Sequence, residues 1–503
     1  MKLASFLAFG MVLLAPISQA AEPAFSLTVL HTNDIHSRVE PAMISKKPYG
    51  GYARVATLLK RYRTLDKNVV VLNAGDSFQG TLYYNVYRGA ADALLMNICG
   101  YDAMTLGNHE FDDGPVGLAP FLRTVQFPVV CCNLDFTNEP NVRNFVRPST
   151  ILNVSGERIA LIGVMTPDLL SISSPGDQIK MKPLDSSIQT EINKYKIQGI
   201  NKFILLSHMG YDEDKAIAAR IPDLDMIVGG HSHSYLGNAQ IPGLPAPIGP
   251  YPTLVGNTVI VQAWEWAKLL GRIKVDFDAS GKVVGTRDGA PIVVDSTVPE
   301  DQMVKSAIVA LRKPIEALQS QPVGFTQNGL DRGSTPELPI GSVIADAQLA
   351  AMKKAGAVAA FMNRGGVRAP IEPGEITYGE VISVQPFGNT LVVIDLTGKE
   401  IQDMLEVGTS KGLVQVSAGF FYSVAGQKVT SMTLNGAPVQ LDKTYRVVVN
   451  NFMARGGDGF VSLQNAKGYR LDTGVLDLDV LIDYLKANNP TDIKIGSRIK
   501  ASN

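Results

Sequence analysis

The chain has 503 residues, which at roughly 150 residues per domain predicts three domains or two large ones and excludes a single small module. Charged residues make up 18% of the sequence and hydrophobic residues 45%, an ordinary globular composition that excludes a disordered or coiled-coil chain. The formal net charge is −1. With so little net charge there is no overall field to attract a polyanion, so duplex nucleic acid is not expected as a partner.

Residues 1–20 have the plan of a secretory signal peptide. Lys2 is followed by an apolar run from Leu3 to Ile17, and a Ser-Gln-Ala tripeptide then precedes Ala21. No later stretch approaches the roughly 20 uninterrupted apolar residues of a membrane-spanning helix. We therefore expect an exported mature protein, periplasmic or secreted, without a transmembrane segment.

Residues 21–298 alternate short β-rich runs with helical patterns, which predicts an α/β domain. The first elements are a strand at 27–30, a helix at 54–61 and a strand at 69–72. Further strands are predicted at 103–106, 129–133, 159–164, 203–206 and 226–228. Nearly every strand runs directly into a polar cluster. Because functional sites of open α/β sheets collect at the carboxyl ends of strands, this placement indicates a site there.

A connecting helix and a second domain follow. Residues 300–311 have apolar spacing suited to a helix, and we interpret 299–321 as a connecting helix. From 322 to 503 the texture changes. A helix is predicted at 340–354, strands at 390–396, 420–424 and 445–449, and Gly-rich loops lie between them. We interpret 322–503 as a second domain.

The six histidines gather in the first part of the chain, as His31, His36, His109, His208, His231 and His233. Asp34 and His36 are two residues apart, as are His231 and His233, so each pair points to one side of an extended backbone. A carboxylate such as Asp76 can bridge two cations, and mixed nitrogen and oxygen ligands suit Zn, Mn or Fe. These residues predict a metal centre. His31 precedes the motif by one strand step, so we assign it a structural role.

Two sets of motifs in order carry a resemblance to known families. Asp34-x-His36, Gly75-Asp76, Gly107-Asn108-His109-Glu110, His208 and Gly230-His231-x-His233 resemble the signature of the calcineurin-like metallophosphoesterases. Asn363–Arg368, Gln385–Asn389 and Asn451–Phe460 resemble the C-terminal domain of secreted 5′-nucleotidases. The likeness covers essentially the whole mature chain. It implies a four-layer α/β sandwich with a dinuclear metal site, followed by an α+β substrate-binding domain.

The resemblance implies two divalent metal ions, Zn, Mn or similar. One would be held by Asp34, His36, Asp76 and His233, and the other by Asp76, Asn108, His208 and His231. His109, oriented by Asp112, would be the catalytic dyad that stabilises the phosphoryl transition state and assists the leaving oxygen. Periplasmic relatives often carry Gln where this chain has His233, so this position leaves the preferred metal open.

The resemblance also places a nucleotide on the second domain. Phe387 and Phe452 would stack on the two faces of the base, and Asn363 would contact the base. Arg364 and Arg368 would bind phosphate. Asp458 would accept hydrogen bonds from the ribose hydroxyls. On spacing alone, both phenylalanines would be interpreted as core residues. Arg332 is a further candidate phosphate ligand, although the sequence after it, Pro336–Gly341, departs from the Arg-Glu-x-Asn-x-Gly of some relatives.

We therefore expect metal-dependent hydrolysis of nucleoside 5′-monophosphates to nucleoside and phosphate by a water activated by two metals. The same metal centre would also serve a 2′,3′-cyclic-nucleotide 2′-phosphodiesterase or a hydrolase of UDP-sugars and nucleotide diphosphates. Relatives specialised for sulfur oxidation share the architecture, but no residue favours that activity. An alternative of another class is an exported protein without catalysis that binds nucleotides or a partner. The complete ligand set argues against that alternative.

Overall fold

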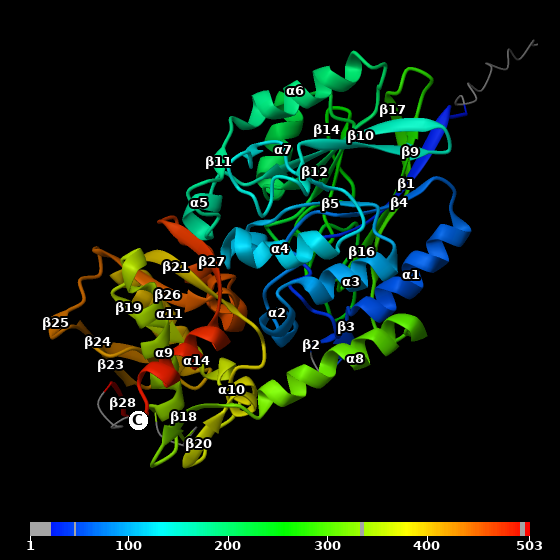
Figure 1. The fold of residues 1–503 in the computed structure, drawn as a ribbon. Coiled ribbons are helices and arrows are strands. Elements are labelled where there is room, and N and C mark those ends of the chain that lie inside the picture. Colours follow the sequence, from blue (N-terminus) through cyan, green and yellow to red (C-terminus); the bar gives the residue numbers. More distant parts are fainter. Residues whose placement is uncertain (1–21, 45–46, 332–335, 493–497, 503) are drawn as a thin grey trace, which may run out of the picture.

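The computed structural model describes residues 22–44, 47–331, 336–492 and 498–502. The predicted signal peptide and Arg332 lie outside the described residues. Figure 1 shows two bodies, with the long helix α8 (Gln302–Gln319) running along the first body toward the second. Within the described residues, no helix combines the length and the apolar character needed to cross a membrane.

The first body contains two large sheets. One has the strand order β17 (Val283–Val293), β16 (Leu269–Phe277), β1 (Phe25–Thr32), β4 (Val69–Asn73), β5 (Ala103–Thr105), β6 (Val129–Val130), β8 (Val146–Arg147). The other has the order β14 (Thr253–Val255), β15 (Thr258–Val261), β13 (Met226–Gly229), β12 (Phe203–His208), β10 (Glu157–Met165), β9 (Ser149–Val154). Small hairpins and bridges pair β2 (Ala42–Ile44) with β3 (Lys47–Tyr49), and β7 (Leu134–Asp135) with β11 (Lys180–Met181).

Helices cover the outer face of each sheet, so the domain has four layers. Against the first sheet lie α1 (Tyr52–Leu65), α2 (Leu82–Tyr87), α3 (Ala90–Cys99) and α4 (Gly114–Thr124). Against the second lie α6 (Leu184–Lys196) and α7 (Tyr211–Arg220), with the short α5 (Leu169–Ile172) nearby. Along β1, Val29 packs between the sheets and Leu30 packs under the helices, because successive side chains point to opposite faces. The predicted α/β sandwich is confirmed.

The central strands of both sheets are parallel, and the candidate metal ligands follow their carboxyl ends. β1, β4 and β5 run parallel, and they precede Asp34, Asp76 and Asn108. In the second sheet β12 ends at His208, and the parallel β13 ends two residues before His231. The two sheets therefore bring ligand loops that are far apart in sequence to one edge of the sandwich.

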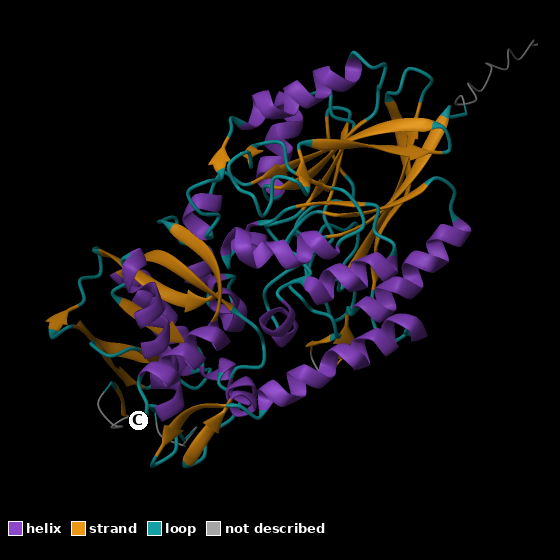
Figure 2. Ribbon diagram, viewed as in Figure 1, coloured by secondary structure: helices purple, strands orange, loops and turns teal. Residues whose placement is uncertain are grey.

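The second body is built around a five-stranded sheet in the order β22 (Gln415–Val416), β19 (Ala359–Met362), β26 (Thr444–Asn450), β21 (Thr390–Thr397), β27 (Arg470–Leu476). One face carries α9 (Pro339–Met352), α10 (Tyr378–Val384) and α14 (Asp477–Ala487). The other carries α11 (Gly398–Thr409), α12 (Asn451–Ala454), α13 (Val461–Gln464) and a sheet of β25 (Ala437–Pro438), β24 (Lys428–Leu434), β23 (Phe420–Ala425) and β28 (Ile499–Ser502). β18 (Pro322–Thr326) pairs with β20 (Gly374–Thr377) beside α8 (Figure 2).

The two bodies contact each other at the edge that carries the ligand loops. Arg38 Nη2 of the first domain donates to the carbonyl oxygen of Phe387 in the second, at 3.0 Å. Asn85 Nδ2 donates to the Tyr378 hydroxyl, also at 3.0 Å. At Gly474 in β27, an added Cβ would overlap the His109 ring. The second domain therefore lies directly over His109.

Candidate metal centre

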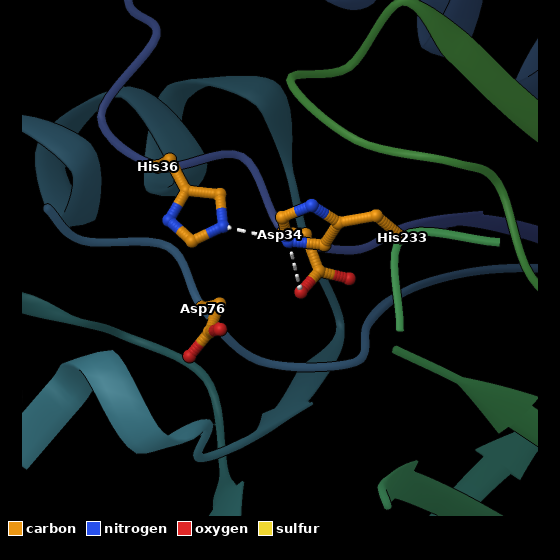
Figure 3. Close-up of side chains that lie close together, drawn as sticks. All are labelled: Asp34, His36, Asp76 and His233. Atoms are coloured by element: carbon orange, nitrogen blue, oxygen red, sulfur yellow. Dashed lines mark hydrogen bonds and ion pairs between the residues drawn. The ribbon is translucent and has the colours of Figure 1, made fainter. Parts of the chain in front are cut away.

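The structure brings the predicted metal ligands into two adjoining groups. Ligand atoms of Asp34, His36, Asp76 and His233 lie within 4.8 Å of one another, as do those of Asp76, His208 and His231. Asn108 Oδ1 joins the second group, 3.2 Å from His208 Nε2 and 2.9 Å from His231 Nδ1. Figure 3 shows the first group, with the His36 and His233 rings edge to face and Asp34 next to His233. Asp76 belongs to both groups.

Contacts behind the imidazoles show which nitrogen faces the centre. His36 Nδ1 is 3.2 Å from the carbonyl oxygen of Phe78, and His208 Nδ1 is 2.7 Å from that of Ala74. A carbonyl only accepts, so both Nδ1 atoms carry hydrogen and both Nε2 atoms are the nitrogens that face the centre. His36 Nε2 is 3.0 Å from His233 Nε2, and His208 Nε2 is 3.1 Å from Asp76 Oδ2. Such convergence of nitrogen and carboxylate lone pairs fits a divalent cation.

The charges inside the centre are strongly coupled. Burial alone would lower the pKa of His208, but the Asp76 carboxylate outweighs it and raises that pKa to about 9. Burial opposes ionisation of Asp76 too, yet His208 and His109 hold its pKa well below the usual range. In contrast, burial and the neighbouring His109 lower the pKa of His36 to about 3, so His36 is a neutral donor. Since ligands must be deprotonated to bind, cation binding here would release protons.

The ligand loops adopt an uncommon backbone conformation. Asp34, His36, Asp76, His231 and His233 have φ between 48° and 73°. Non-glycine residues rarely adopt left-handed φ, and such residues cluster at functional sites where their surroundings hold them. Here the Asp34 amide donates to the Gly75 carbonyl and the His36 amide to the Asp76 carbonyl, both at 3.0 Å. The two loops therefore hold each other in place.

Glu110 fastens two of these loops and was not assigned a role from the sequence. Its buried carboxylate accepts backbone N–H groups of Gly107 at 2.5 Å, Asp76 at 2.9 Å and Ser77 at 2.7 Å. A carboxylate that binds several backbone amides braces both segments. Glu110 stands in the Gly-Asn-His-Glu motif, but its sequence position gives no sign that the side chain turns back to the Asp76 loop.

His109 and Asp112 form a close pair beside the two ligand groups. His109 Nδ1 lies 2.6 Å from Asp112 Oδ2, and Ser173 Oγ donates to Asp112 Oδ1 at 2.9 Å. Burial alone would lower the pKa of His109, but the carboxylates of Asp112 and Asp76 outweigh it and raise that pKa to about 10. His109 is therefore protonated at neutral pH. His31 lies apart, with its Nε2 2.8 Å from the Tyr251 hydroxyl.

Two predicted substrate residues of the second domain lie in direct contact. Asn363 Nδ2 donates to Asp458 Oδ2 at 3.1 Å, and Asn450 Nδ2 donates to Asn363 Oδ1 at 2.9 Å. Asp458 has φ 57°, in the tight turn that follows α12. The turn and the start of the 363–368 segment therefore form one surface.

The predicted base-stacking residues are exposed. Phe387 is 40% and Phe452 43% accessible, which excludes a core role for either ring. The Arg368 guanidinium is 5.6 Å from the centre of the Phe387 ring, and Arg364 Nη1 donates to the Gly412 carbonyl at 3.4 Å. Arg368 therefore lies beside the exposed Phe387 ring, whereas Arg364 contacts the loop that follows α11.

Comparison with known proteins identifies the family. The family model described as calcineurin-like phosphoesterase matches residues 27–235, and that described as the 5′-nucleotidase C-terminal domain matches 319–465. The 5′-nucleotidase of Diplobatis ommata is 34% identical, over 94% of this chain and 89% of that protein. The trifunctional nucleotide phosphoesterase YfkN of Bacillus subtilis is also 34% identical over 95% of this chain, which spans only 35% of that longer protein. The crystal structure of a 5′-nucleotidase precursor from Thermus thermophilus matches with TM-score 0.64 and 41% identity, covering 95% of this chain and 100% of that chain. The chain belongs to the 5′-nucleotidase family, with a calcineurin-like phosphoesterase domain followed by a 5′-nucleotidase C-terminal domain.

Proposed function

We propose that the protein is a metal-dependent 5′-nucleotidase, which hydrolyses nucleoside 5′-monophosphates to nucleoside and phosphate. The observation that carries this proposal is the pair of ligand groups that share Asp76, placed beside the His109–Asp112 pair. The relationship to 5′-nucleotidases over nearly the whole chain supports it. With residues 1–20 as a signal peptide, the enzyme would act in the periplasm or outside the cell.

The proposal assigns a cation to each ligand group. One would be held by Asp34, His36, Asp76 and His233, and the other by Asp76, Asn108, His208 and His231. The mixture of imidazole, carboxylate and amide donors suits Zn or Mn. When bound, two such cations lower the pKa of an attacking water and neutralise charge on the phosphoryl oxygens.

His109 would donate the proton that the leaving oxygen needs. Its Nδ1–H points to Asp112, so the ring is fixed with Nε2 toward the metal centre, 4.0 Å from Asp76 Oδ2. Although burial opposes it, the Asp112 carboxylate raises the pKa of His109 and so favours the protonated ring. The imidazolium would also attract negative charge that develops on the phosphoryl group.

The second domain would bind the nucleoside. A base stacked between Phe387 and Phe452 would gain roughly 1–3 kcal/mol, and stacking tolerates any base because every base has a π-face. Arg364 and Arg368 would hold phosphate through their planar guanidinium groups. Asp458 would accept hydrogen bonds from the ribose hydroxyls, and Asn363 would contact the base.

The test is substrate preference with a chelator control. The purified mature chain is incubated with Mn²⁺ or Zn²⁺ and with AMP, 2′,3′-cyclic AMP or UDP-glucose, and products are separated by chromatography. We expect chelator-sensitive release of adenosine from AMP, well above the other two rates. The 34% identity to a trifunctional nucleotide phosphoesterase supports testing more than one nucleotide substrate. Faster cleavage of the cyclic nucleotide or of UDP-glucose would make that compound the proposed substrate in place of AMP. Lack of turnover with either metal would contradict an enzyme and favour a nucleotide-binding protein.

A further inference from the structure

A loop beside the metal centre carries the two tryptophans of the chain. Trp264 and Trp266 flank Glu265 between β15 and β16. Trp264, Trp266 and Ala267 have φ of 63°, 60° and 51°, a left-handed conformation that is costly for such residues. The loop is bound to the ligand segments, because the Trp266 amide donates to the Asp34 carbonyl at 2.7 Å. Its strained backbone is thus held next to the ligands.

Glu265 contacts the outer nitrogen of a metal ligand. Its side chain is buried, and Oε2 lies 2.6 Å from His233 Nδ1. Glu265 Oε2 and His233 Nδ1 thus form a close ion pair, and the negative charge favours the ring form with hydrogen on Nδ1. Arg455 Nη2 lies 3.1 Å from the same nitrogen. His233 Nε2 is then the nitrogen that faces the centre, 3.2 Å from Asp34 Oδ1 and 3.0 Å from His36 Nε2. Glu265 therefore selects the tautomer in which His233 can bind a cation.

Glu265 is itself fixed by a buried lysine. Lys268 Nζ donates to Glu265 Oε1 at 2.8 Å, and Lys268 is 1% exposed. The ammonium lies 3.4 Å from the centre of the Trp264 ring and 4.3 Å from that of Trp266. Two indole faces compensate for the water that a buried ammonium loses. Arg455 of the second domain also approaches, with Nη1 3.7 Å from Glu265 Oε2.

His233 differs from His36 and His208 in the group that contacts its outer nitrogen. The outer nitrogens of His36 and His208 donate to neutral backbone carbonyls, whereas that of His233 lies in an ion pair with a charged carboxylate. A carboxylate next to the outer nitrogen of an imidazole fixes the orientation of the ring and makes the inner nitrogen a more basic metal ligand. Glu265 thus acts on one of the two ligand groups.

We propose that Glu265, held by Lys268 between the two tryptophans, is a positioning residue that presents Nε2 of His233 to the cation bound with Asp34, His36 and Asp76. It would strengthen binding at that cation position and leave the position at His208 and His231 unchanged. This inference rests on the metal assignment of the proposed function.

The experiment measures cation binding directly. The full mature chain, stripped with chelator, is titrated with Co²⁺ by calorimetry and by tryptophan fluorescence, which reports on the loop because both tryptophans flank Glu265. The variants are Glu265→Ala and Glu265→Gln. Asp66→Asn is the matched control, since Asp66 is also a shielded carboxylate, paired with Arg272 at 2.9 Å and Lys274 at 3.4 Å.

We expect Glu265→Ala to weaken one of two cation-binding steps by about 10–100-fold and to leave the other step unchanged. The fluorescence response should move to the same higher Co²⁺ concentration. Glu265→Gln keeps an oxygen that can accept from Nδ1–H, so it should lose less affinity than Ala. Asp66→Asn should bind both cations like the wild type, even if its melting temperature falls.

Two results would overturn the inference while the metal assignment stands. One is unchanged binding in Glu265→Ala. The other is an equal weakening of both steps that follows the loss in melting temperature, as a purely structural role predicts. A wild-type chain that binds no divalent cation would instead overturn the metal assignment and this inference together. Should Glu265→Ala fail to fold because Lys268 is left unpaired, Glu265→Ala/Lys268→Met removes both charges and should show the same loss at one step.

Discussion

In the proposed mechanism, His109 donates a proton to the leaving oxygen, so its loss should matter only for leaving groups that need protonation. We expect His109→Gln to lower kcat for AMP on the order of 10²–10⁴-fold, because the departing ribose oxygen is a strong base. With p-nitrophenyl phosphate the fall should be much smaller, since nitrophenolate leaves without protonation. Steady-state kinetics on both substrates check this. Equal losses would mean that His109 serves the metal centre and does not donate a proton.

Phe452 should act on nucleotides and not on small phosphate esters. We expect Phe452→Ala to raise KM for AMP about tenfold, because roughly 1–3 kcal/mol of stacking is lost. The KM for ribose 5-phosphate, which has no base, should stay the same. Tyr469→Ala is a suitable control, because Tyr469 is a similarly exposed aromatic residue, 44% accessible, in the same domain. A matching rise for ribose 5-phosphate would indicate damage to folding.

Sequence patterns identify the candidate ligands of this site but miss the residues that support them. Spacing indicates the pairs Asp34/His36 and His231/His233, the family resemblance implies the full set of candidate ligands, and the structure brings them into two groups. Glu265 stands in no such motif, and Glu110 stands in one that does not reveal where its side chain points. Their roles depend on a loop that turns back onto Asp34 and on a carboxylate that reaches the Asp76 loop. Contacts of this kind arise only from the packed chain.

Among secondary-structure elements, those with strong apolar periodicity agree with prediction. The strands predicted at 27–30, 69–72 and 203–206 are present as β1, β4 and β12. The connecting helix predicted at 299–321 is present as α8, Gln302–Gln319, whose buried stripe consists of Val304, Ile308 and Ile315. The strand predicted at 129–133 ends at Val130, since the Cys132 amide donates to Gly163 of the other sheet. Tertiary packing sets these boundaries.

Asp92, in the first turn of α3, should make stability depend on pH. It is buried and accepts from Ser37 Oγ at 2.7 Å, and burial raises its pKa to about 7 from 3.8. A carboxyl with a raised folded-state pKa favours folding most at low pH, and this contribution is lost as pH rises from about 4 to 7. The full effect is on the order of 4 kcal/mol. We expect Asp92→Asn to gain stability relative to the wild type as pH rises.

Urea unfolding midpoints of wild type and Asp92→Asn between pH 5 and pH 8 check this prediction. The difference between the two proteins is the relevant quantity, because burial also raises the pKa of Asp214 and Asp477 to about 8 in each of them. The difference should grow up to pH 7 and then level off. Parallel pH profiles would show that Asp92 is ionised in the folded chain at all these values.

At the scale of the whole molecule, one glycine sets how closely the domains approach. Gly474 in β27 has φ 66°, and a side chain there would overlap His109. We expect Gly474→Ala to displace the second domain from His109, which would raise the radius of gyration and increase proteolysis near α8. Gly436→Ala is the matched control, because Gly436 has φ 81° with no atom within 4 Å of an added Cβ. Both variants place alanine at a positive φ, so small-angle scattering on the two separates loss of the domain contact from backbone strain. Identical scattering profiles for the two variants would contradict the prediction.

Arg455 contacts Glu265, so cation binding at His233 and docking of the second domain both involve the Glu265 carboxylate. Arg455 belongs to the second domain, and its Nη2 also lies 3.1 Å from His233 Nδ1. Occupancy of the His233 position and docking of the second domain therefore act on the same charges. Thermodynamic linkage requires that any factor by which docking changes cation affinity equals the factor by which the cation changes docking. Metal concentration would then set how the population of molecules divides between docked and undocked arrangements.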